Sequence, residues 1–451
     1  MSGTERLRQG YHDLLRQEIL ALIPQNAKSI LDLGCGTGEL GKALKQRQSC
    51  LVDGIEINKE AANAAKQNLD HVFTDNLNRF DPSFLSRKYD TLIFADILEH
   101  LIAPWLVLKK FTSVLEDNGV VIASIPNIAH PWIVSQLQKG LFRYELAGLL
   151  DVTHLRFFTK TTIGQLFYKA GLKITEITPY PNEKNPVQYH ITAIKPTVEH
   201  KDPLATILIL TFNAWKYTAQ CIGSIKAHTE IPYKILVIDN GSTDETVERL
   251  REDDSIYHIE NTCNLGFARG YNIGLECVDT PYFVISNSDV VVTRNWLKRM
   301  LEHLRDDDSL AGIGPRSNYA SGPQLVKDVK YNTESELADF ADRFSRSGQD
   351  PVTYFHRLVF FFVLFKSGIL GEVGLLDERY EGGNFEDDDF CLRVLTAKHK
   401  LAIDNTVFIH HYGSQTFKEN KIDYAKAMEE NKKRFMEKWH LTDAPPKQAS
   451  S

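Results

Sequence analysis

The sequence lacks the marks of a secreted or membrane-spanning protein. Its six cysteines include no CxxC pair and no disulfide-like spacing, which predicts free thiols in a reducing compartment. The N-terminal stretch is charged and contains no apolar signal core. The longest apolar run, "LVFFFVLF" at 358–365, is far shorter than the ~20 residues of a membrane helix, and it predicts a buried strand. We therefore expect a cytoplasmic protein without a transmembrane segment, peripheral to a membrane at most.

An excess of basic residues is also missing. The net charge of −7 argues against a nucleic-acid-binding face. Hydrophobic residues make up 43% of the chain and charged residues 25%, which are the proportions of a folded soluble protein. A chain of 451 residues is too long for one ordinary domain, so we expect two.

Two α/β patterns follow one another along the chain. Short apolar runs alternate with helical stretches such as 59–69 and 104–115, which predicts a parallel sheet covered on both faces in each half. The strands are predicted at 29–33, 51–57, 91–96 and 120–126 in the first half and at 205–213, 233–240, 256–261 and 282–289 in the second.

A polar stretch with two prolines, 193–204, separates the halves and predicts a linker. We accordingly expect one domain over 1–197 and a second over 198–440. Residues 441–451 are rich in small and polar residues and predict a disordered tail.

The stretch "LDLGCGTGELG" (31–41) follows the first predicted strand and opens a helix, which is how backbone N–H groups are offered to a ligand. A dinucleotide fingerprint would need glycine at position 39, where the chain has Glu39. The observed spacing suits a cationic nucleoside better than a pyrophosphate. Glu56 ends the second strand, where a carboxylate can accept hydrogen bonds from two ribose hydroxyls; the alternative is a surface acid at a strand end.

Together with "FTDN" (73–76) and "YDTLIFADILEHL" (89–101), this turn resembles the class I S-adenosylmethionine-dependent methyltransferases over about 25–195. The triplet "LEH" is typical of enzymes acting on small molecules, and the N/D-P-P-aromatic turn of nucleic-acid amino-methylases is missing. The stretch "GLLDVTHLRFFT" (148–159) is similar to methyltransferases encoded among bacterial surface-polysaccharide genes. The resemblance implies that S-adenosylmethionine is bound by Asp32, Gly34, Gly36, Gly38, Glu56, Asp75 and Asp96.

The same resemblance implies an in-line transfer of an already activated methyl group, for which positioning matters most. A hydroxyl acceptor still benefits from a base, and His154 or His130 could serve. For either one alone, the alternative of a structural or surface histidine is favoured. We select His154 as the candidate.

In the second half, "GGNFEDDDF" (382–390) sets four acids in a row, which is either a solvated charge run or part of an active site. A helix beginning here favours acids in its first turn. Asp387 lies four, seven and eight residues before the apolar positions 391, 394 and 395, so its side chain should point to the protein interior. Burying a carboxylate is unfavourable, which suggests that this one has a function. Asp389 lies four residues before Arg393 and should pair with it on the outside.

The second half also resembles the family 2 glycosyltransferases of GT-A fold, from about 205 to 417. The resemblance rests on "LVIDNGSTDET" (236–246), "CNLGFARGYNIGL" (263–275) and "ISNSDV" (285–290). It implies a nucleotide-sugar donor linked through UDP, dTDP or GDP. The donor-binding residues that it implies are Thr211, Asn213, Asp239, Gly270, Asn272 and Asn287.

A divalent cation, Mn²⁺ or Mg²⁺, is implied by the same resemblance, because a departing nucleoside diphosphate gains negative charge. Asn287 stands where many members have a first acid, which leaves Asp289 as the only anionic ligand of that motif. In "VFIHHYGSQTF" (407–417), His411 fits the ligand position better than His410 when counted back from Gly413.

Family resemblance also gives the acidic run a role. It implies that Asp387 is the general base of an inverting transfer and that Glu386 contacts the acceptor, while the neighbouring "DERYEGGN" (377–384) meets the acceptor. The other two acids are expected to be mainly structural.

The sequence therefore predicts an α/β protein of two domains, a Rossmann-like methyltransferase followed by a GT-A glycosyltransferase. We expect both to act in bacterial glycan synthesis, on a glycan or lipid-linked oligosaccharide acceptor at the inner face of the plasma membrane, with no nucleic-acid partner. Two alternatives stay open. One is a glycosyltransferase whose methyltransferase-like domain is not catalytic, and the other is a non-catalytic carbohydrate-binding protein.

Overall fold

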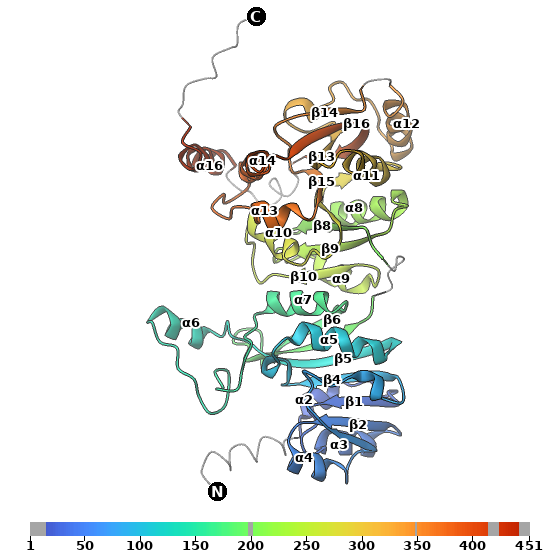
Figure 1. The fold of residues 1–451 in the computed structure, drawn as a ribbon, viewed down its shortest axis with the longest axis vertical. Helices are drawn as coiled ribbons and strands as arrows, with labels where there is room; N and C mark the ends of the chain where they lie inside the picture. The colour runs from blue at the N-terminus through green and yellow to red at the C-terminus, as the bar shows by residue number, and fades with distance from the viewer. Residues whose placement is uncertain (1–14, 197–201, 348–349, 414–423, 442–451) are drawn as a thin grey trace, which may run out of the picture. The chain divides into compact units, whose positions relative to one another are not determined.

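The computed structural model describes residues 15–196, 202–347, 350–413 and 424–441. The chain divides into two compact units, Met1–Thr197 with Arg251–His258, and Val198–Leu250 with Ile259–Ser451 (Figure 1). The centre of the predicted linker and, apart from Leu441, the whole predicted tail lie outside the described residues.

The first unit is built on one seven-stranded sheet, in the order β3-β2-β1-β4-β5-β7-β6. Neighbouring strands from β3 to β5 pair in parallel, as the alternating pattern predicts. The strands are β1 (Ser29–Leu33), β2 (Leu51–Glu56), β3 (His71–Thr74), β4 (Tyr89–Ala95), β5 (Leu115–Pro126), β6 (Lys173–Tyr180) and β7 (Gln188–Ile194).

The expectation of a wholly parallel sheet is wrong for the last two strands. β7 runs antiparallel to both β5 and β6, so the first sheet is mixed. A short connection joins β6 to β7, and a short connection permits only antiparallel neighbours, because a parallel pair needs a crossover of a dozen residues or more.

Helices cover both faces of this sheet. Successive residues of β1 show why: Ile30 belongs to one buried cluster, whereas Leu31 and Leu33 belong to another. Since neighbouring side chains of a strand point to opposite faces, the sheet has a core on each side. The helices of the unit are α2 (Gln17–Leu22), α3 (Glu39–Arg47), α4 (Lys59–Ala65), α5 (Pro104–Phe111), α6 (Pro131–Gln138) and α7 (Lys160–Lys169).

The second unit has a nine-stranded mixed sheet, in the order β10-β9-β8-β11-β15-β13-β16-β12, with β14 added on β16. β8 pairs in parallel with β9 and β11, whereas β15 is antiparallel to both of its neighbours. The strands are β8 (Ala205–Thr211), β9 (Tyr233–Asp239), β10 (Tyr257–Glu260), β11 (Tyr282–Asn287), β12 (Val290–Val291), β13 (Leu310–Ser317), β14 (Val352–Tyr354), β15 (Phe362–Lys366) and β16 (Lys400–His411).

The apolar run at 358–365 forms a strand only in its second half, within β15. Leu358, Phe360 and Phe361 are nevertheless buried, so the run is core as expected even where it is not strand. The helices of this unit are α8 (Trp215–His228), α9 (Thr246–Glu252), α10 (Phe267–Leu275), α11 (Trp296–Asp306), α12 (Glu334–Phe344), α13 (Ile369–Val373), α14 (Glu386–Thr396) and α16 (Tyr424–Lys438).

Among the described residues, no helix has the length and the apolar character needed to cross a lipid bilayer.

Two glycines of the second unit make a matched pair for testing the packing. A Cβ at Gly312 of β13 would lie 2.2 Å from the ring of Phe365, whereas a Cβ at Gly223 of α8 would meet nothing within 4 Å. We expect Gly312→Ala to lower the free energy of unfolding by about 1–3 kcal/mol through overpacking. Gly223→Ala should raise it by about 0.5–1 kcal/mol, since alanine favours the helix. Urea titration of both variants checks this, and equal effects would contradict the packing described.

Candidate active sites

The first candidate site begins at the turn between β1 and α3. Gly34, Gly36 and Gly38 all have positive φ, of 86°, 53° and 81°. Residues other than glycine rarely adopt such backbone angles. A Cβ at Gly34 would also lie 2.9 Å from the Cδ1 of Ile97. The turn therefore needs its glycines. It leads directly into α3, and the backbone N–H groups at the start of a helix can bind a ligand.

Glu56, the last residue of β2, faces this turn and is buried. One carboxylate oxygen accepts from the N–H of Gly36 at 3.0 Å, and the other accepts from the N–H of Asn58 at 2.7 Å. A carboxylate can accept about four hydrogen bonds, so capacity remains for two hydroxyl donors. This arrangement fits the ribose of a bound nucleoside.

The other acids predicted at this site differ in their surroundings. Burial and the neighbouring Glu56 raise the pKa of Asp32 to about 7. Asp75 follows β3, is half-buried and donates its N–H to the carbonyl of Glu56 at 3.2 Å. Asp96 accepts from the hydroxyl of Ser124 at 2.6 Å and pairs with Arg16. The parallel strands thus bring these acids and the glycine turn to one edge of the sheet.

His154 is buried, and its Nδ1 lies 3.2 Å from the carbonyl oxygen of Leu149. Its ring lies 4.8 Å from that of His100. Burial and then His100 lower the pKa of His154, so its imidazole is neutral near pH 7. The other histidine considered, His130, instead accepts the N–H of Trp132 at the start of α6.

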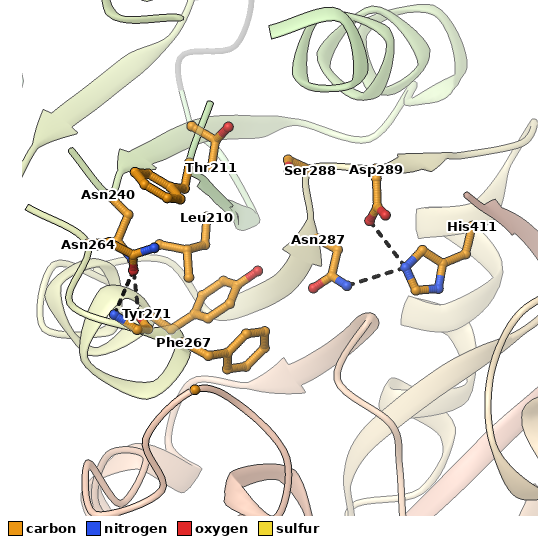
Figure 2. Close-up of a pocket in the computed structure, with 13 residues that line it drawn as sticks. Leu210, Thr211, Asn240, Asn264, Phe267, Tyr271, Asn287, Ser288, Asp289 and His411 are labelled. Atoms are coloured by element: carbon orange, nitrogen blue, oxygen red, sulfur yellow. Dashed lines mark hydrogen bonds and ion pairs between the residues drawn. The ribbon is translucent and has the colours of Figure 1, made fainter. Parts of the chain in front are cut away.

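The second candidate site is a pocket of about 160 Å³ in the other unit (Figure 2). The ends of β8 and β11 form one side of it, through Thr211 and Asn287. Two aromatic side chains of α10, Phe267 and Tyr271, form another side. Gly382, from the loop before the acidic run, also lines it.

Asp289 and His411 meet in this pocket, with 3.1 Å between Asp289 Oδ1 and His411 Nε2 (Figure 2). The Nδ1 of His411 lies 2.9 Å from the carbonyl oxygen of Tyr319, and this contact directs Nε2 toward Asp289. His410 does not line the pocket, and its Nδ1 lies 2.6 Å from the hydroxyl of Tyr331. A carboxylate and an imidazole nitrogen side by side fit a divalent cation such as Mn²⁺.

The predicted donor residues divide into two groups. Thr211 and Asn287 line the pocket, whereas Asp239 ends the neighbouring β9 and accepts from the N–H groups of Gly241 and Ser242. Burial raises the pKa of Asp239 to about 6.

Three further donor predictions fall outside the pocket lining. Asn213 accepts from the N–H of Thr243 at 2.8 Å. Gly270 allows α10 to approach β8, since a Cβ there would lie 2.5 Å from Leu210. The side-chain amide of Asn272 donates to the carbonyl of Leu376 and accepts from its N–H, so these contacts hold the local backbone in place.

Sequence reasoning missed other residues that line the pocket. Asn240 donates to the side chain of Asn264 at 2.9 Å, and both face the pocket with Phe267 and Tyr271 (Figure 2). All four lie within the stretches already quoted for the resemblance, between 236 and 275. The signal was present, but only the fold shows which side chains of those stretches face inward.

The acidic run begins α14, and most of it is not solvated. Glu386, Asp387 and Asp389 are only 4%, 6% and 0% exposed. The prediction that Asp389 lies outside is therefore wrong, although it does pair with Arg393, at 2.9 Å. The physical reason is α16, whose end covers this face: Lys438 lies 2.6 Å from Asp389, and Trp439 donates to it at 2.9 Å.

Asp387 faces the interior, as the helical spacing predicts. Burial and Asp388 raise its pKa to about 6, and Arg357 opposes this rise from 3.9 Å. Burial and Asp387 raise the pKa of Glu386 well above its usual range, and one oxygen of Glu386 has no hydrogen-bond partner within the described part of the chain. Neither residue is among those lining the pocket of Figure 2.

The loop before α14 has an unusual backbone. Four consecutive residues, Gly382 to Phe385, have φ of 74°, 87°, 75° and 71°, which is strained for Asn384 and Phe385. Asn431 of α16 is fully buried and holds this loop, donating to the carbonyls of Glu381, Gly383 and Asn384 at 2.8, 2.9 and 3.2 Å.

Comparison with known proteins matches both units to families. Residues 5–177 match a family model described as a methyltransferase domain, and residues 206–368 match one described as glycosyl transferase family 2.

Curated relatives divide in the same way. An uncharacterized glycosyltransferase of Haemophilus influenzae is 34% identical over 116 residues, which is 25% of this chain and 36% of that protein. A teichoic acid poly(glycerol phosphate) polymerase of Staphylococcus epidermidis is 31% identical over 127 residues, 27% of this chain and 17% of that protein. A ubiquinone biosynthesis O-methyltransferase of Haemophilus ducreyi is 26% identical over 137 residues, 26% of this chain and 58% of that protein. The matches thus span less than two thirds of each relative.

The buried cluster around Asp389 yields a stability prediction. Asp389→Asn removes the negative charge that Arg393 and Lys438 share, and breaking a buried ion pair in this way costs about 3–5 kcal/mol. We expect a correspondingly lower midpoint in urea unfolding. The control is Asp308→Asn, a change of the same kind at an exposed position, which should leave the midpoint unchanged. If both variants unfold like the wild type, the ion-pair cluster contributes nothing to stability.

Proposed function

The chain carries a methyltransferase domain followed by a family 2 glycosyltransferase domain, and on this premise we propose that it is a bifunctional enzyme of bacterial glycan synthesis. In this proposal the second domain transfers a sugar from a nucleotide donor to a glycan acceptor, and the first transfers a methyl group to a sugar hydroxyl. The main support is the pairing of Asp289 with His411 in a pocket between strand ends and aromatic side chains.

Asp387 is proposed as the general base of sugar transfer. A pKa of about 6 leaves it ionised at neutral pH and still able to take up a proton. As the acceptor oxygen forms its bond to the anomeric carbon, the hydroxyl proton passes to Asp387 and the bond to the diphosphate breaks. Because attack comes from the face opposite the diphosphate, a single displacement inverts the configuration. Glu386 is proposed to contact the acceptor.

Asp289 and His411 are proposed to hold a divalent cation, Mn²⁺ or Mg²⁺. When bound, such an ion offsets the negative charge that develops on a departing nucleoside diphosphate. The imidazole favours Mn²⁺, since Mg²⁺ prefers oxygen ligands. Thr211, Asn213, Asp239, Gly270, Asn272 and Asn287 are proposed to bind or shape the site of a UDP-, dTDP- or GDP-linked sugar.

In the first domain, we propose that Glu56 accepts hydrogen bonds from the two ribose hydroxyls of S-adenosylmethionine, whose sulfonium supplies an activated methyl group. The glycine turn offers its backbone to the same molecule, and Asp32, Asp75 and Asp96 complete the surroundings. His154, predicted from the sequence as the base for the acceptor hydroxyl, is neutral and so able to accept a proton.

The glycan class is proposed from two observations. One relative is named as a polymerase of teichoic acid, and the stretch 148–159 resembles methyltransferases of surface-polysaccharide gene clusters. Both favour an envelope glycan or a lipid-linked oligosaccharide as acceptor, handled at the inner face of the plasma membrane.

The sugar-transfer proposal predicts a split between binding and catalysis. Asp387→Asn keeps the shape of the side chain but removes the base, so transfer should slow by about 10²–10⁴-fold. Nucleotide binding, measured as a Mn²⁺-dependent thermal shift with UDP, GDP and dTDP, should be unchanged. A ligand at 100 times its Kd stabilises the folded state by about 2.7 kcal/mol, which such a shift can detect. Asp308→Asn is again the control.

Full transfer by Asp387→Asn would remove its assignment as base. If no nucleotide shifts the melting, with or without Mn²⁺, the second domain is not a nucleotide-sugar enzyme.

The methyl-transfer proposal is tested at Glu56. Glu56→Gln removes the charge that receives the ribose hydroxyls, and hydrogen bonds to charged groups contribute about 1.5–3 kcal/mol. We therefore expect S-adenosylhomocysteine to bind roughly 10–150-fold more weakly in calorimetry. Glu60→Gln, an exposed change four residues later, should bind as the wild type does. Equal affinity in all three proteins would show that Glu56 does not hold the ribose.

A further inference from the structure

Three side chains of the first unit come together with the chemistry of metal ligands. Glu99 and His100 lie on the 3₁₀ turn Leu98–His100, which follows β4, and His154 comes from the later stretch 148–159. One ligand atom from each residue lies within 4.8 Å of the other two. Backbone bonds fix this arrangement, since the N–H groups of Leu155 and Arg156 both donate to the carbonyl of Glu99, at 2.8 and 3.0 Å.

Within this cluster, the surroundings of Glu99 give the strongest indication of a bound cation. It is only 1% exposed, and neither carboxylate oxygen has a hydrogen-bond partner among the residues that the structure describes. A buried carboxyl group without partners is costly, and more so when it is charged. A cation bound between the three side chains would provide the missing partner.

The two histidines are oriented as metal ligands are. Nδ1 of His100 lies 3.1 Å from the carbonyl oxygen of Thr153, and Nδ1 of His154 lies 3.2 Å from that of Leu149. Contact with a carbonyl oxygen places the ring proton on Nδ1 and leaves the lone pair on Nε2. Metal-binding histidines are held by the same kind of contact.

We propose that Glu99, His100 and His154 bind a divalent cation, Mn²⁺ or Zn²⁺, in the methyltransferase domain. Two imidazoles and one carboxylate suit these ions, and three protein ligands leave a position open for a substrate oxygen. Ligand atoms at about 2.1 Å from an ion can be no more than about 4.2 Å apart. The three side chains therefore need to converge by only a few tenths of an ångström.

The site borders the glycine turn. Ile97, two residues before Glu99, lies so close to Gly34 that a Cβ there would come within 2.9 Å of it. Resting on the proposed methyl transfer, the ion acts by lowering the pKa of a coordinated acceptor hydroxyl. The hydroxyl proton leaves to solvent, the oxygen bonds to the methyl carbon, and the carbon–sulfur bond breaks to give S-adenosylhomocysteine. His154 is then a ligand, and this role replaces that of base.

Counting bound Mn²⁺ by electron paramagnetic resonance tests the site on the full chain. Because Asp289 and His411 form a second candidate metal site, all measurements use Asp289→Asn as the background. That variant is expected to bind one Mn²⁺, with nitrogen couplings from imidazole. Adding Glu99→Gln should weaken binding by at least tenfold, and adding His154→Asn should reduce the nitrogen couplings. Adding Glu116→Gln, at an exposed position, should change nothing.

The proposal would be overturned if the background variant bound neither Mn²⁺ nor Zn²⁺. It would also be overturned if adding Glu99→Gln left the affinity for Mn²⁺ unchanged. Circular dichroism of every variant shows whether a loss of binding is only a loss of fold, and the couplings in the folded background variant identify the ligands directly.

Measurements of methyl transfer distinguish the failure of the metal site from the failure of the proposed methyltransferase function. Treatment with EDTA should abolish methyl transfer and leave the affinity for S-adenosylhomocysteine unchanged. Methyl transfer that continues in EDTA would refute the role of the ion but keep the function. Mn²⁺ bound through Glu99 in a protein without methyl transfer would support the site and refute the function.

Discussion

Parallel pairing at the centre of each sheet is the constraint on which both sites depend. In the first unit β1 pairs with β2 and β4, and in the second β8 pairs with β9 and β11. Parallel strands end at the same edge, so residues that close different strands become neighbours. Glu56 meets the glycine turn in this way, and Thr211 shares a pocket with Asn287. The side chains differ between the two units, but the principle that gathers them is the same.

The central strands could be predicted because strands buried on both faces are continuous apolar runs. The apolar run at 358–365 also predicted part of β15. The other strands, β3, β6, β7, β12, β13, β14 and β16, were not predicted. Strands β3, β12 and β14 are short, β6 is partly exposed, and β13 pairs with β16, which lies far along the chain. Asp389 shows the same limit within a helix. Its spacing to Arg393 predicts their pairing, but only the tertiary structure shows that α16 covers both.

The site residues that could be predicted from the sequence lie in the quoted motifs or at the ends of predicted strands. Stretches quoted for a resemblance already contained Asp289 and His411, and Glu56 was picked out as the acid that ends the second predicted strand. The geometry of all three fits the chemistry proposed for them. The cluster of Glu99, His100 and His154 could not be predicted. The triplet "LEH" is typical of a class of enzyme, but it does not predict a contact with a histidine 54 residues later. Both His154 and His411 contact a backbone carbonyl through Nδ1, a feature that no sequence pattern records.

Three bonds from Asn431 join α16 to the loop that precedes the acidic run. The helix lies beyond residue 368, where the match to the glycosyltransferase family model ends. The loop also lies beyond residue 368, so the pocket, which includes Gly382 and His411, is completed by residues outside the family match. Because Asn431 bonds to residues on both sides of Gly382, a change in the position of α16 would shift this pocket-lining residue.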